Sequence, residues 1–139
     1  AGAIVVGKAV VEVLDPEITA VGGLTMGADP IAVATAAVAA SDGRPMRAFS
    51  VRKETKGHGV GGRIVGPVDS NDVVAVVEDT TTTGSAMFEA IHALADVGIR
   101  IAQVITLVDR SGGVAAHKVG TAGIPYVALV TPSDLGVNE

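Results

Sequence analysis

The chain has 139 residues, 48% of them hydrophobic and only 2% aromatic, which suits one domain with a core of Val, Ile, Leu and Ala, as in a parallel sheet wrapped by helices. Its formal net charge of −5 argues against general affinity for nucleic acid or anionic membranes. Because it contains no cysteine, it has no disulfide framework, thiolate nucleophile or cysteine-based metal site. It has no apolar run of membrane-spanning length and no evident signal peptide, so we expect it to be cytoplasmic.

The first third of the chain is predicted to contain two helices around a strand and a glycine-rich turn. Apolar residues from Ile4 to Leu14 recur at helical spacing, which predicts a helix that buries one face. Residues 18–21 are predicted to form a short strand leading into the glycine-rich segment 22–30. There Asp29 is expected to cap a helix that begins at Pro30. The glycines favour either an anion pocket or close packing of strand on helix, and both interpretations remain open.

A cationic segment follows the next predicted strand, at residues 46–51. Residues 52–63 contain four of the ten Lys and Arg residues, one acidic residue and four glycines, a composition that prevents a stable helix or a packed strand. Such a segment could close as a lid over a highly charged anion, although most charge runs are solvated surface hairpins. The anion pockets expected nearby favour the lid.

The segment that organises the chain is a buried strand followed directly by a helix. After a possible edge strand at residues 64–68, five apolar residues, four of them valine, predict a strand at 73–77 that is buried on both faces. We expect it to end at Glu78 and Asp79, before four threonines, a glycine and a helix that starts at Ser85.

We interpret this turn as a phosphate cradle. Backbone N–H groups at a helix start favour an anion, threonine hydroxyls add donors, and Gly84 permits close approach. Glu78 and Asp79 would repel a phosphate, so we expect them to accept hydrogen bonds from the two hydroxyls of a sugar, which together with the cradle predicts a ribose 5-phosphate site. The alternative is a polar turn that only caps the helix. The turn lacks the lysine of a Walker loop, so ordinary P-loop NTPase chemistry is not expected.

The last third of the chain repeats the strand and helix pattern, with strands at 101–108 and 124–130 and a helix at 114–121 between them. Arg110 follows the first of these strands, where it could contact a planar acceptor in bidentate fashion, or pair with Asp109 or a helix end. The three histidines share no metal-ligand spacing. The whole pattern predicts an α/β fold with a Rossmann-like, mostly parallel sheet flanked by helices.

Taken together, these segments resemble the type I phosphoribosyltransferases, and most closely the orotate phosphoribosyltransferases of actinobacteria. Residues 76–86 resemble the family's motif for 5-phospho-α-D-ribosyl 1-diphosphate (PRPP), and residues 52–59 resemble the catalytic loop of the orotate enzymes. Residues 108–110 are similar to the segment with the orotate-binding arginine, and residues 22–30 stand at the pyrophosphate loop. The resemblance implies one phosphoribosyltransferase core domain over residues 1–139, truncated at its N-terminus relative to the family because the hood over the base has no counterpart.

The resemblance also implies an activity, the transfer of the phosphoribosyl group from PRPP to orotate, and a role for each motif. The implied PRPP-binding residues are Arg52, Glu78, Asp79, Thr80, Thr81, Thr82, Thr83, Gly84, Ser85 and Ala86. The implied catalytic residues are Lys53, Lys56 and His58, and the implied pyrophosphate loop contains Thr25, Met26 and Gly27. Thr82 and Arg110 would contact orotate.

The family further implies Mg²⁺ bound mainly through PRPP rather than by protein ligands, and a homodimer in which the lid loop acts in the neighbouring subunit's site. Met26 stands where relatives often have a lysine, and the hood's lysine and aromatic contacts to orotate have no counterpart. Three alternatives stay open: a phosphoribosyltransferase for another base, a PRPP-binding regulatory module without catalysis, and a generic nucleotide-binding domain.

Overall fold

The computed structural model describes residues 1–54 and 62–137 of the chain. Its centre is one six-stranded sheet with the strand order β3-β2-β1-β4-β5-β6. The strands are β1 (Ala20–Leu24), β2 (Arg47–Val51), β3 (Ile64–Val65), β4 (Val73–Thr81), β5 (Arg100–Asp109) and β6 (Tyr126–Val130). The helices are α1 (Gly2–Val13), α2 (Asp29–Ser41), α3 (Ser85–Asp96), α4 (Val114–Thr121) and the short 3₁₀ helix η1 (Ser133–Leu135). All strand pairs are parallel except β2 with β3, so the predicted mostly parallel α/β fold is confirmed.

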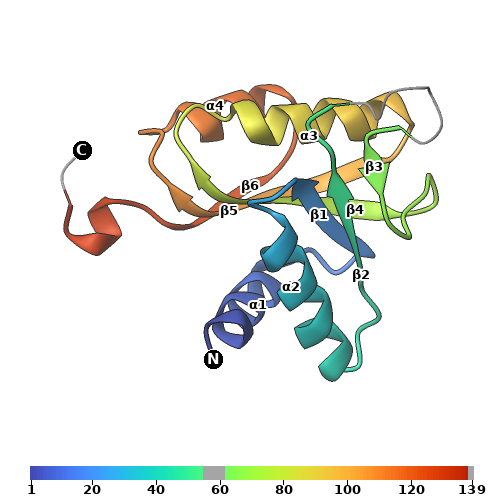
Figure 1. The fold of residues 1–139 in the computed structure, drawn as a ribbon. Helices are drawn as coiled ribbons and strands as arrows, with labels where there is room; N and C mark the ends of the chain where they lie inside the picture. The colour runs from blue at the N-terminus through green and yellow to red at the C-terminus, as the bar shows by residue number, and fades with distance from the viewer. Residues whose placement is uncertain (55–61, 138–139) are drawn as a thin grey trace.

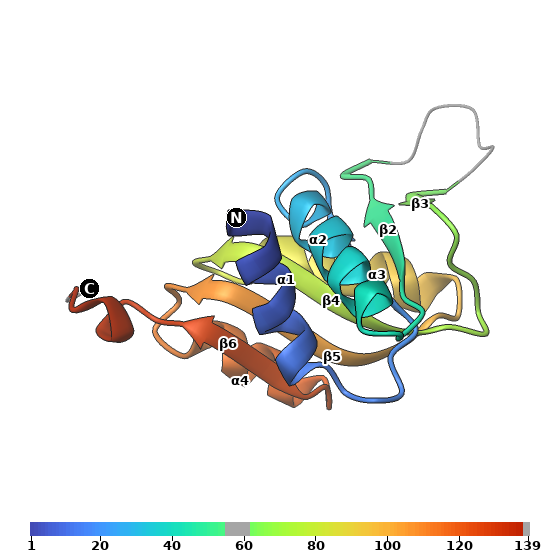
Figure 2. The ribbon, with the colours of Figure 1, turned by 90° about the horizontal axis from the view of Figure 1, so that it is seen from below.

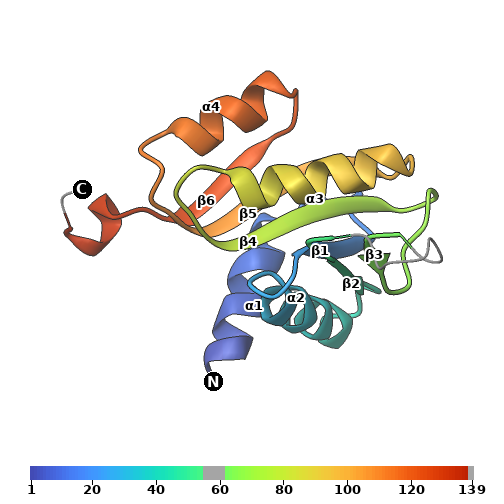
Figure 3. The ribbon, with the colours of Figure 1, turned by 45° about the horizontal axis from the view of Figure 1, so that its top comes forward.

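Helices cover both faces of the sheet. Helices α3 and α4 lie on one face, and α1 and α2 lie on the other (Figures 1 and 3). Figure 2 looks onto the face with α1 and α2. Two hydrophobic clusters fill these interfaces, and β4 contributes to both, because Val74 and Val76 pack toward α3 whereas Ala75 and Val77 pack toward α1 and α2. This double burial explains the valine run from which the strand was predicted.

The first helix and the edge strand differ from the expectation. Ile4, at the start of the predicted apolar face, is 55% exposed, because α1 reaches the core only through its later residues such as Val10. Strand β3 has two residues rather than five, and it is the antiparallel edge of the sheet. Among the described residues, no helix has both the length and the apolar character needed to cross a membrane.

The strand β1 is displaced from its predicted position and includes two of the glycines assigned to the turn. A Cβ on Gly22 would lie 2.4 Å from the carbonyl oxygen of Phe49, and one on Gly23 would lie 2.3 Å from that of Val77. These distances are too short for any side chain, so both glycines are required by close packing within the sheet. For Gly22 and Gly23 the packing interpretation is therefore right, and the glycine-rich turn shrinks to residues 25–28.

Strand β4 is longer than the valine run. It continues through Glu78 to Thr81, because Glu78 pairs with Thr106 of β5 and Thr81 pairs with Asp109. The expectation that the strand ends at the two carboxylates is therefore wrong. Residues 78–81 lie at the carboxyl end of β4, and because they belong to the strand, their side chains point alternately to the two faces of the sheet.

Candidate active site

The candidate site lies where β1 and β4 end side by side. The chain leaves β1 through α2 toward β2 and leaves β4 through α3 toward β5, so the two connections diverge and cover opposite faces of the sheet. In open α/β sheets, this change of direction leaves a crevice at the carboxyl ends of the strands, where ligands bind. Residues 25–28, 82–84 and 110–113 all follow strands that end at this edge.

The turn from β4 to α3 has the shape expected of an anion cradle. Gly84 has a φ of +85° and precedes the first residue of α3. Its N–H donates to the Thr81 hydroxyl at 3.0 Å, and the Thr83 hydroxyl lies 2.9 Å from that of Ser85. The Ser85 N–H donates to the Thr83 hydroxyl at 3.3 Å, and the N-cap residue Gly84 offers no side chain to the amides that follow, which are the donors that an anion at a helix start uses.

The predicted cradle residues divide into two groups in the structure. Thr80, Thr82, Thr83 and Ser85 are exposed at the turn, where they can reach a ligand. Thr81 is buried and its hydroxyl already serves Gly84, so it shapes the turn. The next residue, Ala86, is half-buried within α3.

The two carboxylates expected to act together lie in different environments. Successive residues of a strand point to opposite faces, and Glu78 is 5% exposed whereas Asp79 is exposed. One carboxylate oxygen of Glu78 is buried without a hydrogen-bond partner among the described residues. Burial, and then the neighbouring Asp79 carboxylate, raise the pKa of Glu78 to about 8. The Glu78 carboxyl in turn lowers the pKa of Asp79, which is therefore the anionic member of the pair at neutral pH.

The shortened glycine-rich turn lies directly against Asp79. A Cβ on Gly27 would come within 2.8 Å of an Asp79 carboxylate oxygen, so only glycine lets this backbone approach the strand so closely. Thr25 donates through its hydroxyl to the Asp29 carboxylate at 2.6 Å, and the Ser50 hydroxyl donates to the same carboxylate at 2.8 Å. Through these two hydrogen bonds Asp29 ties the turn to the end of β2. Asp29 is the first residue of α2 and Ala28 is its N-cap residue, so the prediction that Asp29 caps the helix is wrong.

Between these ties, the turn presents Met26 to solvent. Its side chain is 78% exposed, and the Thr25–Met26 peptide bond is cis. Because Gly27 lies against Asp79, the predicted pyrophosphate loop and the predicted ribose-binding carboxylate are neighbours in space, although about fifty residues separate them in sequence.

Arg110 lies next to the cradle, on the other side of β4. Its backbone N–H donates to the carbonyl oxygen of Thr81 at 2.8 Å, which places the backbone of Arg110 beside the turn that contains Thr82. The buried Asp109 before it accepts hydrogen bonds from the Ser111 hydroxyl at 2.6 Å and from the Tyr126 hydroxyl at 2.8 Å. Burial opposes ionisation of Asp109, but these hydrogen bonds outweigh it and lower the pKa of the carboxyl.

The cationic segment is described only at its two ends. Arg52 and Lys53 follow β2, and Arg63 holds their backbone by donating to the carbonyl oxygens of both residues, at 2.8 and 2.9 Å. Arg63 also pairs with Glu89 of α3 at 3.0 Å. The predicted catalytic residues Lys56 and His58 lie outside the described residues.

Sequence reasoning missed three side chains that shape this site: Asp29 as a tie, Arg63 as a clamp on the loop base, and Lys118. The Lys118 ammonium donates to the carbonyl oxygen of Thr83 at 2.9 Å from α4. Asp29 was expected only to cap a helix, and neither Arg63 nor Lys118 was assigned a contact, because the sequence does not show partners on other elements.

No protein-family model matches the chain. It is 48% identical over 124 residues to the orotate phosphoribosyltransferase of Corynebacterium glutamicum, which covers 89% of this chain and 65% of that protein. It is 44% identical over 124 residues to the enzyme of the same name from Streptomyces avermitilis, with 89% of this chain and 68% of that protein covered. Among solved structures, orotate phosphoribosyltransferase from Mycobacterium tuberculosis in complex with PRPP superposes with a TM-score of 0.84 at 38% identity, covering 96% of this chain and 75% of that one. The chain thus spans about two thirds of the length of the relatives it matches.

Proposed function

The chain belongs to the orotate phosphoribosyltransferase family, and we propose that it transfers the phosphoribosyl group of PRPP to orotate, giving orotidine 5′-monophosphate and pyrophosphate. The observation that carries this proposal is the meeting of three turns at one sheet edge. Gly27 lies against Asp79, and Arg110 donates its N–H to Thr81. PRPP requires a pyrophosphate loop and a site for its ribose 5-phosphate, and orotate requires a base-binding arginine close to C1 of the same ribose.

Each turn would bind one part of the substrates. The amides and hydroxyls of residues 82–85, with the α3 dipole behind them, would hold the 5-phosphate. Asp79 would accept hydrogen bonds from the ribose hydroxyls, and Glu78 would join it once ionised. Thr82 and Arg110 would hold orotate, for which a guanidinium offers two parallel donors.

The reaction breaks the bond between C1 of the ribose and the pyrophosphate oxygen, so positive charge develops on the sugar and negative charge on the leaving group. The protein then needs no nucleophile of its own. It needs positioning, cations at the leaving oxygens and exclusion of water. We propose that Lys53, Lys56 and His58 provide the cations and close the site, with Arg52 at the base of the loop.

Mg²⁺ is part of the proposal, and it would neutralise the leaving pyrophosphate. Among residues 1–54 and 62–137, no three His, Asp or Glu side chains gather into a metal site. The exposed Asp79 carboxylate beside Gly27 is an oxygen ligand of the kind that Mg²⁺ takes together with substrate phosphates. The residues present therefore fit an ion carried in by PRPP and touched by one carboxylate.

We further propose a cytoplasmic homodimer in which each lid loop closes over the partner subunit's site. Mixing two inactive variants tests this arrangement, one changed in the lid (Lys56→Ala) and one in the base contact (Arg110→Ala). If the loop acts in trans, one site of each mixed dimer combines an unchanged lid with an unchanged Arg110, and activity recovers. If the loop acts within its own subunit, each site of the mixed dimer carries one of the two changes, and both sites stay inactive. Recovery of activity after mixing therefore supports the trans arrangement, and no recovery contradicts it.

The proposed reaction is tested by pyrophosphate release from PRPP and Mg²⁺, with and without orotate. We expect release that depends on orotate and is much weaker with uracil, hypoxanthine or adenine. Release with one of those bases instead would assign another base. PRPP binding without release for any base would indicate a regulatory module, and absence of PRPP binding would overturn the proposal.

A further inference from the structure

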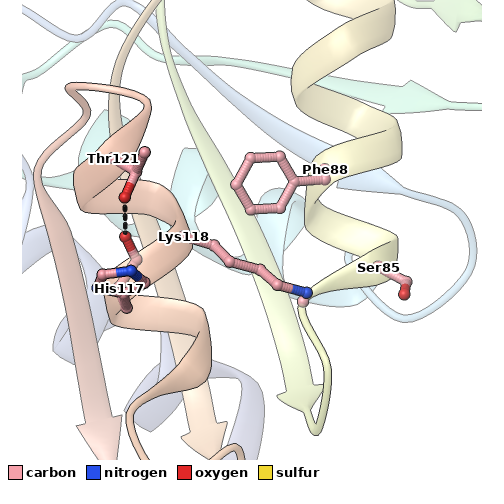
Figure 4. Close-up of a pocket in the computed structure, with 6 residues that line it drawn as sticks. Ser85, Phe88, His117, Lys118 and Thr121 are labelled. Atoms are coloured by element: carbon pink, nitrogen blue, oxygen red, sulfur yellow. Dashed lines mark hydrogen bonds between the residues drawn. The ribbon is translucent and has the colours of Figure 1, made fainter.

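A cation reaches the phosphate cradle from a helix that the site otherwise does not use. Lys118 lies in the last turn of α4, and its ammonium donates to the carbonyl oxygen of Thr83 at 2.9 Å. Figure 4 shows the side chain extending from α4 toward the start of α3 near Ser85. Lys118 and Thr83 are 35 positions apart in sequence.

This contact completes the restraint on one peptide group of the cradle. The peptide between Thr83 and Gly84 has its N–H held by the Thr81 hydroxyl at 3.0 Å and its carbonyl held by Lys118. Gly84 follows with a φ of +85°, a conformation that glycine adopts but does not enforce. Without Lys118, the carbonyl end of this peptide would lose its described partner, and the peptide could rotate.

The Lys118 stem adds a second restraint. Its Cδ lies 3.9 Å from the position that a Cβ on Gly84 would occupy, so the aliphatic chain packs over the glycine. The Gly84 N–H of this peptide donates to the Thr81 hydroxyl, so the orientation of the peptide sets how the chain enters α3 and hence where the first-turn amides of that helix point. A loop already in its binding conformation gives up less entropy when an anion arrives.

Lys118 also brings positive charge to a turn whose own sequence, residues 80–86, has none. A surface lysine in the last turn of a helix is otherwise explained by the negative end of the helix dipole, which would affect stability alone. The hydrogen bond to Thr83 distinguishes Lys118 from such a residue, because it joins α4 to the cradle.

We infer that Lys118 is a positioning residue for the 5-phosphate of PRPP: by holding the Thr83 carbonyl it fixes the cradle amides and adds a cation beside them. This inference rests on the proposed function. It assigns Lys118 to one end of the substrate, so ligands that carry only one end can test it.

The test compares Lys118→Met, which keeps the stem and removes the charge, with Lys118→Arg and with Lys8→Met, a matched control on the exposed side of α1. A pocket of about 510 Å³ between α3 and α4, lined by Phe88 and Lys118 among others, leaves room for the larger arginine. Calorimetry gives the Kd of each variant for PRPP, for ribose 5-phosphate and for pyrophosphate.

We expect Lys118→Met to weaken ribose 5-phosphate and PRPP about tenfold, to leave pyrophosphate unchanged, and to be largely restored in Lys118→Arg. In the free chain, the amide NMR signals of Gly84 and Ser85 should move in Lys118→Met and stay in place in Lys8→Met. These signals report the cradle without any ligand, and thermal unfolding checks that all variants fold.

Two results would overturn the inference alone: wild-type affinity of Lys118→Met for ribose 5-phosphate, or equal weakening of ribose 5-phosphate and pyrophosphate. If the wild-type chain bound neither PRPP nor ribose 5-phosphate, the proposed function would fall, and the inference with it. The three ligands therefore separate the failure of one from the failure of both.

Discussion

Replacing Glu78 by glutamine should flatten the pH dependence of the chain's stability between about pH 5 and 8. Burial, followed by the Asp79 carboxylate, raises the pKa of Glu78 from 4.5 to about 8 in the folded chain. Between these values the folded chain holds a proton that the unfolded chain has released. The contribution to stability is therefore complete below pH 4.5 and is lost as the pH rises through about 8.

The size of the effect follows from this single proton. A difference of one bound proton changes the free energy of unfolding by about 1.4 kcal/mol per pH unit. Because the slope halves near the folded pKa, wild type should lose roughly 2 kcal/mol between about pH 6 and 8 from this group. Glutamine has a similar shape and no proton to release, so Glu78→Gln should lack this loss.

Urea denaturation at several pH values between about 5 and 9 measures the difference. Glu12→Gln, a change at an exposed glutamate of α1, should follow the wild-type curve. Asp79→Asn should move the wild-type decline to lower pH, because it removes the second cause of the raised pKa. Parallel curves for wild type and Glu78→Gln would refute the assignment of a buried, protonated carboxyl.

Three further changes probe the core, the base end and the lid. Gly23→Ala would place a Cβ 2.3 Å from the Val77 carbonyl oxygen and should cost about 2 kcal/mol or more in urea unfolding, whereas Gly2→Ala, with nothing within 4 Å, should cost almost none; equal costs would contradict the packing role. Tyr126→Phe removes the hydrogen bond to the buried carboxylate at the end of β5, and should raise the KM for orotate more than the KM for PRPP; the reverse order would separate Tyr126 from the base site. Lys56→Ala should lower kcat far more than it weakens ribose 5-phosphate binding, and equal losses in kinetic and binding assays would contradict a lid role.

The sequence predicted the sheet where local composition and burial agree. The valines of β4 face both hydrophobic clusters, so residues 73–77 read as a doubly buried strand without knowledge of their partners. The helix from Ser85 and the turn after β5 were placed equally well, because glycines and polar residues mark both boundaries. The order of the motifs along the chain was therefore sufficient to indicate the family.

The details of the site depend on contacts that no local pattern encodes. Glu78 and Asp79 are residue types common in turns, yet pairing with β5 keeps this part of the chain in the strand. As a result the Glu78 side chain is buried and the Asp79 side chain is exposed. Gly23 belongs to the sheet because the Val77 backbone is close, and Asp29 and Lys118 gain their roles from residues on other elements. Each of these features depends on tertiary packing, which a single sequence does not display.

The most direct test of the site is a crystal structure of this chain with PRPP and Mg²⁺. We expect the 5-phosphate on the amides and hydroxyls of residues 82–85, the ribose hydroxyls at Asp79, and the pyrophosphate over residues 25–27. Residues 79–85 left empty, with PRPP bound at another place on the chain, would contradict the account.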